Sequence, residues 1–295
     1  MKISEVGWIG LGKMGVPMAA NLLKAGFTVR GFDVHAEIGR DLQQDPGFSR
    51  APSGVAAAQG AHAIVLMLPD SGIVDELLWG RGGLAAAAAT GSLVIDMGSS
   101  DPSRSRANAV RLAEKGVRFV DAPVSGGVKR AVAAELSIIA GGQAADIDEA
   151  RPVLQALGKS IVHVGDAGAG HAVKALNNFV SAAGLIAVSE ALVAAQRFGL
   201  DPYVVNRAFN ASSGRNTASE SKAESSMLSG TYDYGFALGL MRKDVQTAAA
   251  LIEAMGIQPA FVESVLGVAA AADEALGAHA DHTAVHAYIA GLRRP

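Results

Sequence analysis

Three glycines near the N-terminus have the spacing of a pyrophosphate-binding turn. After the apolar run Val6–Ile9 comes the segment Gly10-Leu11-Gly12-Lys13-Met14-Gly15. Gly10 would allow a tight turn, Gly12 would let a phosphate approach the backbone, and Gly15 would let the following helix pack on the strand. The first N–H groups of that helix would face the anion. Strand, glycines and helix stand in the required order, so the pattern predicts a dinucleotide site.

A carboxylate ends the second predicted strand, Thr28–Phe32. Asp33 follows Gly15 by 18 positions, where a carboxylate accepts hydrogen bonds from the adenosine ribose hydroxyls and repels a 2′-phosphate. Asp33 therefore favours NAD over NADP. Arg30 and His35 supply positive charge that would suit NADP, and an aspartate at a strand end is often only a helix cap, so both alternatives stay open.

Two later segments could hold a small acid and move its proton. Ser125, Gly126 and Gly127 offer a hydroxyl and unobstructed N–H groups suited to a carboxylate, although turns of this composition are common. Lys174 and Asn178 are four residues apart and would share a helix face. Burying them on an apolar helix requires partners, which a substrate would provide; in the alternative, Lys174 extends to solvent.

The histidines do not predict a metal site. His282 and His286 have the spacing of a zinc-binding helix, but a third ligand is not evident. His171 is expected to be a surface residue in the first turn of its helix. We therefore predict no metal.

Alternating strand and helix patterns predict a parallel sheet in the first half of the chain. The expected strands are Val6–Gly10, Thr28–Phe32, Ala63–Met67, Leu93–Asp96, Arg118–Asp121, Leu136–Ala140 and Ile161–Val164. Asp101 and Pro102 are typical of a helix start. A long helix over Gly170–Phe198 should end at Gly199. The fold class is thus α/β, with a Rossmann dinucleotide-binding domain at residues 1–166 and an all-α domain at 167–295, joined by the long helix.

The composition limits the kinds of partner and the cellular compartment that we expect for this chain. The net charge of −3 shows no basic footprint for nucleic acid. The chain has no cysteine, so nothing requires an oxidising compartment, and we expect a cytoplasmic protein. The apolar stretch Phe179–Ala195 includes Ser181, Ser189 and Glu190 and is expected to be a buried helix rather than a membrane span.

Four motifs in order resemble the β-hydroxyacid dehydrogenase family, which includes 3-hydroxyisobutyrate dehydrogenase, within the 6-phosphogluconate dehydrogenase-like superfamily. They are the cofactor signature GLGKMGVPMAAN from Gly10, the substrate loop DAPVSGG from Asp121, the KxxNN pattern of Lys174, Asn177 and Asn178, and LMRKD ending at Lys243 and Asp244. The resemblance covers nearly the whole chain.

The resemblance implies a hydroxyacid dehydrogenase whose general acid/base is Lys174. Asn177 and Asn178 would contact or orient the substrate, and Ser125 to Gly127 would grip its carboxylate. Leu68, Pro69, Ser99 and Lys243 would lie near NAD. NAD would take the hydride while Lys174 takes the hydroxyl proton, which requires a lowered lysine pKa.

Some positions depart from the family pattern. Ser99 belongs to a Ser-Ser pair where the family usually has Ser-Thr, and Ala134 replaces a usual glycine. Lys129 and Arg130 add two positive charges after the substrate loop. They would either contact a second polar group of the substrate or face solvent.

The substrate stays open among 3-hydroxyisobutyrate, tartronate semialdehyde, threonate and similar small acids, as does the physiological direction. An imine reductase is disfavoured by Lys174 and Asp33, and a non-catalytic NAD-binding module by Lys174. The family resemblance implies a homodimer or homotetramer.

Overall fold

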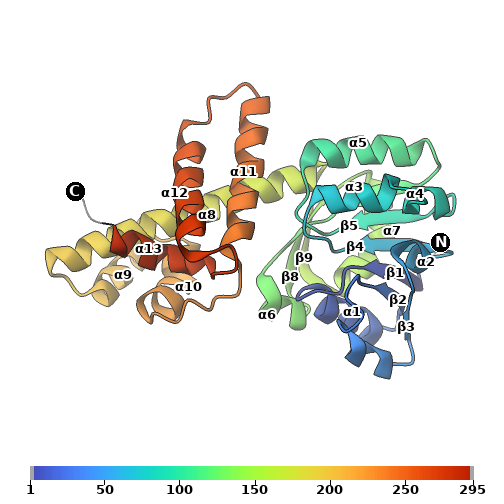
Figure 1. Cartoon of the computed structure of the whole chain (residues 1–295), viewed down its shortest axis with the longest axis horizontal. Helices are drawn as coiled ribbons and strands as arrows, with labels where there is room; N and C mark the ends of the chain where they lie inside the picture. Colours follow the sequence, from blue (N-terminus) through green and yellow to red (C-terminus); the bar gives the residue numbers. More distant parts are fainter. Residues whose placement is uncertain (1–2, 293–295) are drawn as a thin grey trace. The chain divides into compact units, whose positions relative to one another are not determined.

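A computed structural model of the chain describes residues 3–292. The chain divides into two compact units, one ending at Lys174 and one beginning at Ala175. The first holds a sheet with helices and the second is helical (Figure 1). This order confirms the predicted fold class of a Rossmann domain followed by an all-α domain.

Within residues 3–292, nine strands form one sheet in the first unit. They are β1 (Glu5–Ile9), β2 (Thr28–Phe32), β3 (Phe48–Arg50), β4 (Ala63–Leu66), β5 (Leu93–Asp96), β6 (Arg118–Asp121), β7 (Val124–Ser125), β8 (Leu136–Gly141) and β9 (Gly158–Gly165). The path is β3-β2-β1-β4-β5-β6-β8-β7, and β9 pairs with β8. Strands β1 to β6 are mutually parallel, so their carboxyl ends share one edge. The chain reverses direction along the sheet between β1 and β4, where such folds bind ligands.

The helices of the first unit cover this sheet on both faces (Figure 1). They are α1 (Gly15–Lys24), α2 (Gly54–Ala58), α3 (Ser71–Trp79), α4 (Leu84–Ala87), α5 (Pro102–Ala113), α6 (Gly127–Val132) and α7 (Ala144–Gln155), with the 3-10 turn η1 (Arg40–Gln44). Strand β4 is buried along its whole length, as expected for a parallel strand covered on both sides. Asp101 caps α5 and Pro102 begins it, as predicted.

The second unit is built around α8 (Ala169–Phe198), which begins in the first unit. It continues with α9 (Pro202–Asn210), α10 (Thr217–Ser221), the π-helical turn η2 (Ala223–Leu228), α11 (Leu238–Ala254), α12 (Ala260–Leu276), the 3-10 turn η3 (His282–Ala284) and α13 (Val285–Gly291). Gly199 ends α8 with a φ of +96°, a conformation that favours glycine. Leu185, Leu192 and Val245 belong to the core of this unit.

Among the described residues, α8 is the one helix long and apolar enough by length and composition to cross a membrane. About 39% of its most apolar window is buried within the chain. One side of α8, including Leu185 and Leu192, packs into the helical core, while Val180 and Phe198 stay exposed. The helix is therefore partly buried, less completely than the sequence predicted.

Candidate active site

The glycine-rich loop needs glycine at two positions for steric reasons. Gly10 has a φ of +98°, and a Cβ there would lie 2.3 Å from the carbonyl oxygen of Met67. A Cβ on Gly15 would lie 2.0 Å from the carbonyl oxygen of Gly10. At Gly12, in contrast, nothing lies within 4 Å of such an atom. The loop is tightly packed on the protein side and open above Gly12, which fits the close approach of a pyrophosphate.

Asp33, directly after β2, is hydrogen-bonded to this loop. Its Oδ2 accepts the N–H of Leu11 at 2.7 Å, and its Oδ1 accepts the N–H of His35 at 2.9 Å. Each carboxylate oxygen has a second lone pair, so both can still accept a ribose hydroxyl. Asp33 thus fits the predicted ribose contact and also shapes the loop, a role the sequence did not show.

Arg30 and Arg50, the two arginines near Asp33, form hydrogen bonds and an ion pair within the protein. Arg30 pairs with Glu5 and donates to the carbonyl oxygen of Gln59 at 2.5 Å. Arg50, which the sequence did not single out, donates to the carbonyl oxygens of Asp33 and His35 at 3.1 and 3.0 Å. The sequence gives no signal for this role, because β3, the strand that Arg50 ends, has only three residues and no detectable period.

The ends of β4 and β5 meet the same loop. A Cβ on Gly10 would lie 3.3 Å from the Leu68 side chain, and one on Gly98 would lie 2.5 Å from the Leu68 carbonyl oxygen. Asp96 accepts the N–H of Gly98 at 3.0 Å and the hydroxyl of Ser100 at 2.8 Å. The structure therefore brings the predicted cofactor residues Leu68, Pro69 and Ser99 to one edge of the sheet with the glycine loop.

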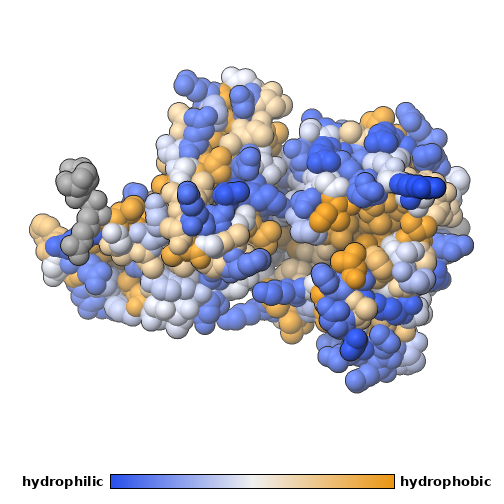
Figure 2. Space-filling view, viewed as in Figure 1, coloured by the Kyte–Doolittle hydropathy of each residue, from blue (hydrophilic) through white to orange (hydrophobic). Residues whose placement is uncertain are grey.

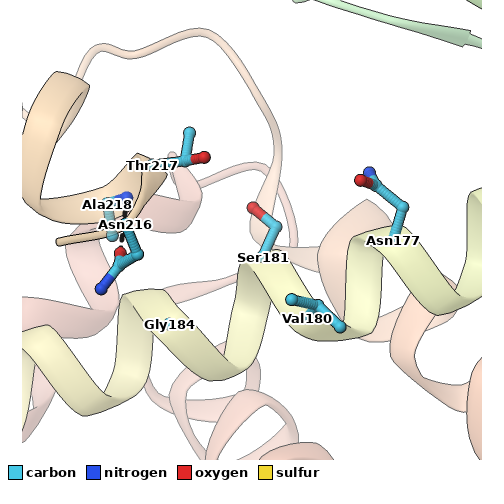
Figure 3. Close-up of a pocket in the computed structure, with 7 residues that line it drawn as sticks. All are labelled: Asn177, Val180, Ser181, Gly184, Asn216, Thr217 and Ala218. Atoms are coloured by element: carbon cyan, nitrogen blue, oxygen red, sulfur yellow. Dashed lines mark hydrogen bonds between the residues drawn. The ribbon is translucent and has the colours of Figure 1, made fainter. Parts of the chain in front are cut away.

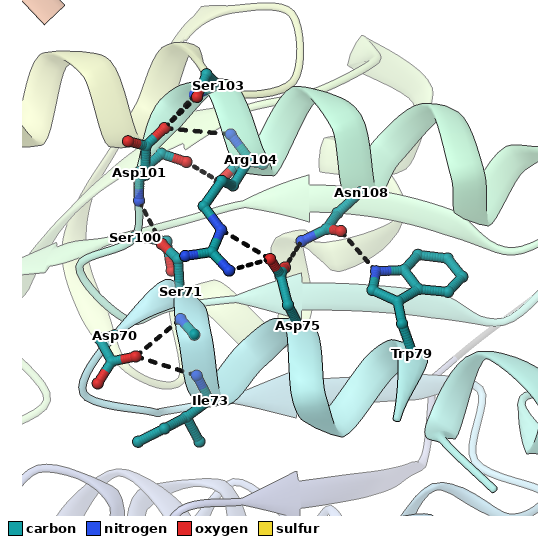
Figure 4. Close-up of polar contacts among 12 residues, drawn as sticks. Asp70, Ser71, Ile73, Asp75, Trp79, Ser100, Asp101, Ser103, Arg104 and Asn108 are labelled. Atoms are coloured by element: carbon teal, nitrogen blue, oxygen red, sulfur yellow. Dashed lines mark hydrogen bonds and ion pairs between the residues drawn. The ribbon is translucent and has the colours of Figure 1, made fainter. Parts of the chain in front are cut away.

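A polar network holds the starts of α3 and α5 together behind this edge (Figure 4). The Ser71 hydroxyl accepts the N–H of Asp101 at 2.6 Å. Asp75 on α3 accepts from Arg104 and from Asn108 on α5, each at 2.7 Å. The turns that precede both helices, with Pro69 and Ser99, are thereby fixed relative to each other.

The segment expected to grip a carboxylate forms a short strand and a helix start. Ser125 lies in β7, which pairs with β8, and Gly126 and Gly127 have φ values of +133° and +67°. Both conformations favour glycine. Asn21 on α1 donates through Nδ2 to the carbonyl oxygen of Ala131 on α6 at 2.7 Å. This buried contact joins the helix after the cofactor loop to the helix after the substrate loop.

The basic pair after the substrate loop is solvent-exposed. Lys129 and Arg130 both lie on the exposed side of α6. The aliphatic part of Arg130 folds over Gly126, where a Cβ would lie 2.6 Å from its Cδ. Ala134, in place of the usual glycine, has a φ of +56°. This position therefore keeps the backbone conformation that glycine would adopt, now with a side chain in it.

A buried carboxylate anchors the start of α8. Asp121 accepts the N–H groups of Gly168 and His171 at 2.7 and 2.8 Å. Burial raises the pKa of Asp121, and the charge of His171 and these N–H donors oppose that rise. Negative charge at a helix N-terminus is favourable, so Asp121 both caps and orients the helix that carries Lys174.

The expectation that His171 is a surface residue was wrong. His171 is 1% exposed, and its Nδ1 lies 2.7 Å from the Ser105 hydroxyl. The first turn of α8 packs against the ends of β5 and β6, which no local pattern reveals. One turn later, Lys174 is 9% exposed, so its side chain is buried rather than extended into solvent.

Two motifs of the helical unit meet at one carboxylate. Asn178 donates to Asp244 Oδ2 at 2.6 Å, and Lys243 Nζ lies 3.3 Å from Asp244 Oδ1. Asn177 donates to the side-chain oxygen of Asn178 at 3.2 Å. Asp244 is 5% exposed and fixes the amide of Asn178.

A pocket in the helical unit begins at Asn177 (Figure 3). Its empty volume is about 340 Å³, a figure that includes space open to solvent, and its lining residues are Asn177, Val180, Ser181, Gly184, Asn216, Thr217 and Ala218. Asn177 and Ser181 project from the same side of α8.

The C-terminal histidines pack inside the helical unit. His282 is 3% exposed against the rings of Tyr234 and Phe236, and burial lowers its pKa. His286 is 7% exposed, and burial lowers its pKa also. In the part of the chain that the structure describes, no group of three His, Cys, Asp or Glu side chains is placed to hold a metal ion.

The parallel sheet and the open glycine loop define a dinucleotide-binding protein. Residues 5–165 match the family model of the NAD-binding domain of 6-phosphogluconate dehydrogenase. Residues 168–289 match that of the NAD-binding domain of NADP-dependent 3-hydroxyisobutyrate dehydrogenase. The chain belongs to the β-hydroxyacid dehydrogenase family and is an NAD-dependent hydroxyacid dehydrogenase.

Related proteins align with this chain over most of their length. The chain is 42% identical to 2-(hydroxymethyl)glutarate dehydrogenase of Eubacterium barkeri, over 84% of this chain and 82% of that one. It is 38% identical to 3-hydroxyisobutyrate dehydrogenase of Pseudomonas aeruginosa, over 86% and 87%. The structure of Mycobacterium tuberculosis 3-hydroxyisobutyrate dehydrogenase with L-serine has a TM-score of 0.88 at 32% identity, covering 97% of this chain and 99% of that one.

Proposed function

We propose that the chain interconverts a small β-hydroxyacid, of the 3-hydroxyisobutyrate type, and its semialdehyde or keto acid, with Lys174 as general acid/base. The observation that carries this proposal is a buried lysine on a helix whose first turn is fixed by Asp121. Burying an ammonium disfavours its charged form, which suits a group that must accept a proton.

Each polar group of the site has a distinct task in this proposal. Ser125 and the N–H groups of Gly126 and Gly127 hold the substrate carboxylate. Asn178, held by Asp244, orients the substrate hydroxyl toward Lys174. When bound, NAD supplies the acceptor for the hydride of the hydroxyl-bearing carbon. Lys174 takes the hydroxyl proton in oxidation and returns it in reduction.

The proposed cofactor contacts come from several strand ends. The N–H groups of the loop from Gly10 to Gly15, with Leu11, Lys13 and Met14 between the glycines, would hold the pyrophosphate, and Asp33 the ribose. Leu68, Pro69 and Ser99 would line the same edge, and Lys243 is a further proposed cofactor residue. We propose NAD over NADP because Asp33 would repel a 2′-phosphate and Arg30 is paired with Glu5.

We also propose a cytoplasmic homodimer or homotetramer whose partner is a small hydroxyacid, without nucleic-acid or membrane partners. Support for self-association comes from apolar side chains exposed on the helical unit, among them Val180, Phe198 and Phe261, which are 66%, 83% and 64% exposed. Figure 2 shows apolar surface along the pair α11 and α12. Sedimentation analysis would measure the assembly.

A steady-state assay of NAD reduction over a panel of hydroxyacids tests the proposed activity. The panel holds 3-hydroxyisobutyrate, 2-(hydroxymethyl)glutarate, L-serine, glycerate and threonate, and the reverse assay holds tartronate semialdehyde. We expect turnover of at least one acid that is lost in Lys174→Ala. NAD binding without turnover of any acid would instead support the non-catalytic module.

A further inference from the structure

A second buried lysine lies in the helical unit. Lys222, between α10 and η2, is 5% exposed. Its Nζ donates to the Ser181 hydroxyl at 3.3 Å and lies 5.3 Å from the ring centre of Tyr234. Within residues 3–292, no carboxylate oxygen lies within 4 Å of this ammonium. Buried charges are normally paired, so this ammonium is unusual in lacking a carboxylate in direct contact within the described residues.

Asp281 carries the carboxylate that acts on Lys222, but its oxygens are hydrogen-bonded to other groups. Asp281 attracts Lys222 at longer range, but its Oδ2 accepts the N–H groups of Gly235 and Phe236 at 2.7 and 3.2 Å. Its Oδ1 accepts the N–H and the hydroxyl of Thr283 and faces His282 at 3.3 Å. Burial lowers the pKa of Lys222 to about 8, against the opposing effect of Asp281. The described contacts of Lys222 therefore include no carboxylate that would neutralise its charge.

Ser181 connects the Lys222 ammonium to the pocket, because it contacts Lys222 and also lines the pocket wall. Its oxygen accepts from Lys222, and no acceptor for its own proton is found in the described part of the chain. Ser181 lines the pocket together with Asn177 and Thr217 (Figure 3). The pocket wall therefore offers an amide, a threonine hydroxyl and a serine hydroxyl that contacts an ammonium, and each of these groups can donate a hydrogen bond.

We propose that this pocket is a carboxylate subsite, in which Lys222 acts through Ser181 to select hydroxyacids that carry a second carboxylate. The inference rests on the proposed function. Ser181 follows Lys174 by two turns of α8, about 10.5 Å along the helix axis. Allowing for the reach of the two side chains, this spacing suits a substrate whose second carboxylate is a few bonds from its hydroxyl. The preferred substrate class is therefore a dicarboxylic hydroxyacid.

The test is a substrate-selectivity ratio. The kcat/KM for 2-(hydroxymethyl)glutarate is divided by that for its analogue in which the distal carboxylate is an amide. Lys222→Met keeps the length of the side chain without its charge, and Ser181→Ala removes the hydroxyl. We expect either substitution to lower the ratio by about 10–100-fold, mainly through the KM of the diacid, as for loss of a charge-assisted hydrogen bond. Lys159→Met, on exposed β9, is the matched control and should keep the wild-type ratio.

A ratio that stays at the wild-type value in both variants overturns the subsite, while turnover of the acids would still uphold the proposed function. If no acid is turned over, the proposed function fails. The subsite is then tested separately by calorimetric titration of the wild type and of Lys222→Met with glutarate. Weaker binding by at least tenfold in the variant supports a carboxylate site, and equal binding or none to either protein overturns it.

Discussion

The amide nitrogen of Asn178 donates to a carboxylate oxygen of Asp244 at 2.6 Å. Asn178 belongs to the segment of α8 that also carries Lys174, whereas Asp244 lies 66 residues later on α11. The same carboxylate group lies 3.3 Å from Lys243 Nζ. Asp244 thus holds the amide of Asn178, the residue to which the proposed function assigns substrate orientation.

This relationship predicts that Asp244 and Asn178 act as a unit. Asp244→Ala and Asn178→Ala should each lower kcat/KM by about tenfold, and the double variant should lose little more, because both substitutions break one contact. The measurement is a double-mutant cycle on kcat/KM. Glu253→Ala, at an exposed position of α11, is the control. Fully additive losses would show that the two residues act independently.

The general acid/base role of Lys174 predicts a loss in chemistry rather than in cofactor binding. Lys174→Ala should lower kcat by about 10²–10⁴-fold, the usual scale of this form of catalysis. Fluorescence titration should give an unchanged Kd for NADH. Lys24→Ala, an exposed lysine at the end of α1, should keep full activity. Near-normal turnover in Lys174→Ala would leave Lys174 as a packing residue.

Asp33 predicts a coupled effect on affinity and on cofactor choice. Asp33→Ala removes the acceptor for the Leu11 N–H as well as the proposed ribose contact. The KM for NAD should rise by about 10–100-fold, and the preference for NAD over NADP should shrink. Kinetics with both cofactors measures this, with the exposed Asp41→Ala as control. If the preference stays unchanged while the KM rises, Asp33 acts only by shaping the loop.

Ala134 predicts a stabilising substitution. Its φ of +56° costs a non-glycine residue about 1 kcal/mol. Ala134→Gly should therefore raise the free energy of unfolding by about 1 kcal/mol in urea titrations. The neighbouring Ala133 has a φ of −81°, so Ala133→Gly should lower it by about 0.5–1 kcal/mol. Destabilisation by both substitutions would contradict a strained Ala134.

The pKa of about 8 at Lys222 predicts a stability change with a definite pH dependence. The folded pKa lies below the unfolded value, so the charged lysine destabilises the fold below pH 8. This cost disappears as pH rises toward about 10.4, where the unfolded chain also loses its proton. Lys222→Met should raise the free energy of unfolding by about 1–3 kcal/mol at pH 7. The advantage should shrink between pH 8 and pH 10, and a constant difference would contradict the lowered pKa.

Sequence pattern alone predicted the elements that local chemistry controls. Strands Thr28–Phe32, Leu93–Asp96 and Arg118–Asp121 have the predicted bounds. Leu93–Asp96 is buried along its whole length, and such a parallel strand has an apolar sequence. The cap at Asp101 and the end of α8 at Gly199 depend on residues a few positions away. Strands β3 and β7, with three and two residues, were missed because so short a run has no detectable period.

The tertiary structure decided which polar groups are buried and what they contact. His171 meets Ser105 across 66 residues, Asn21 meets Ala131 across 110, and Lys222 meets Ser181 across 41. Periodicity can assign a side chain to a face of its own helix, but it does not specify which distant element covers that face. Burial and charge pairing, and with them the pKa of Lys222, depend on those distant elements. The sequence therefore determined the fold class and the motifs, while the folded chain determined which side chains support them.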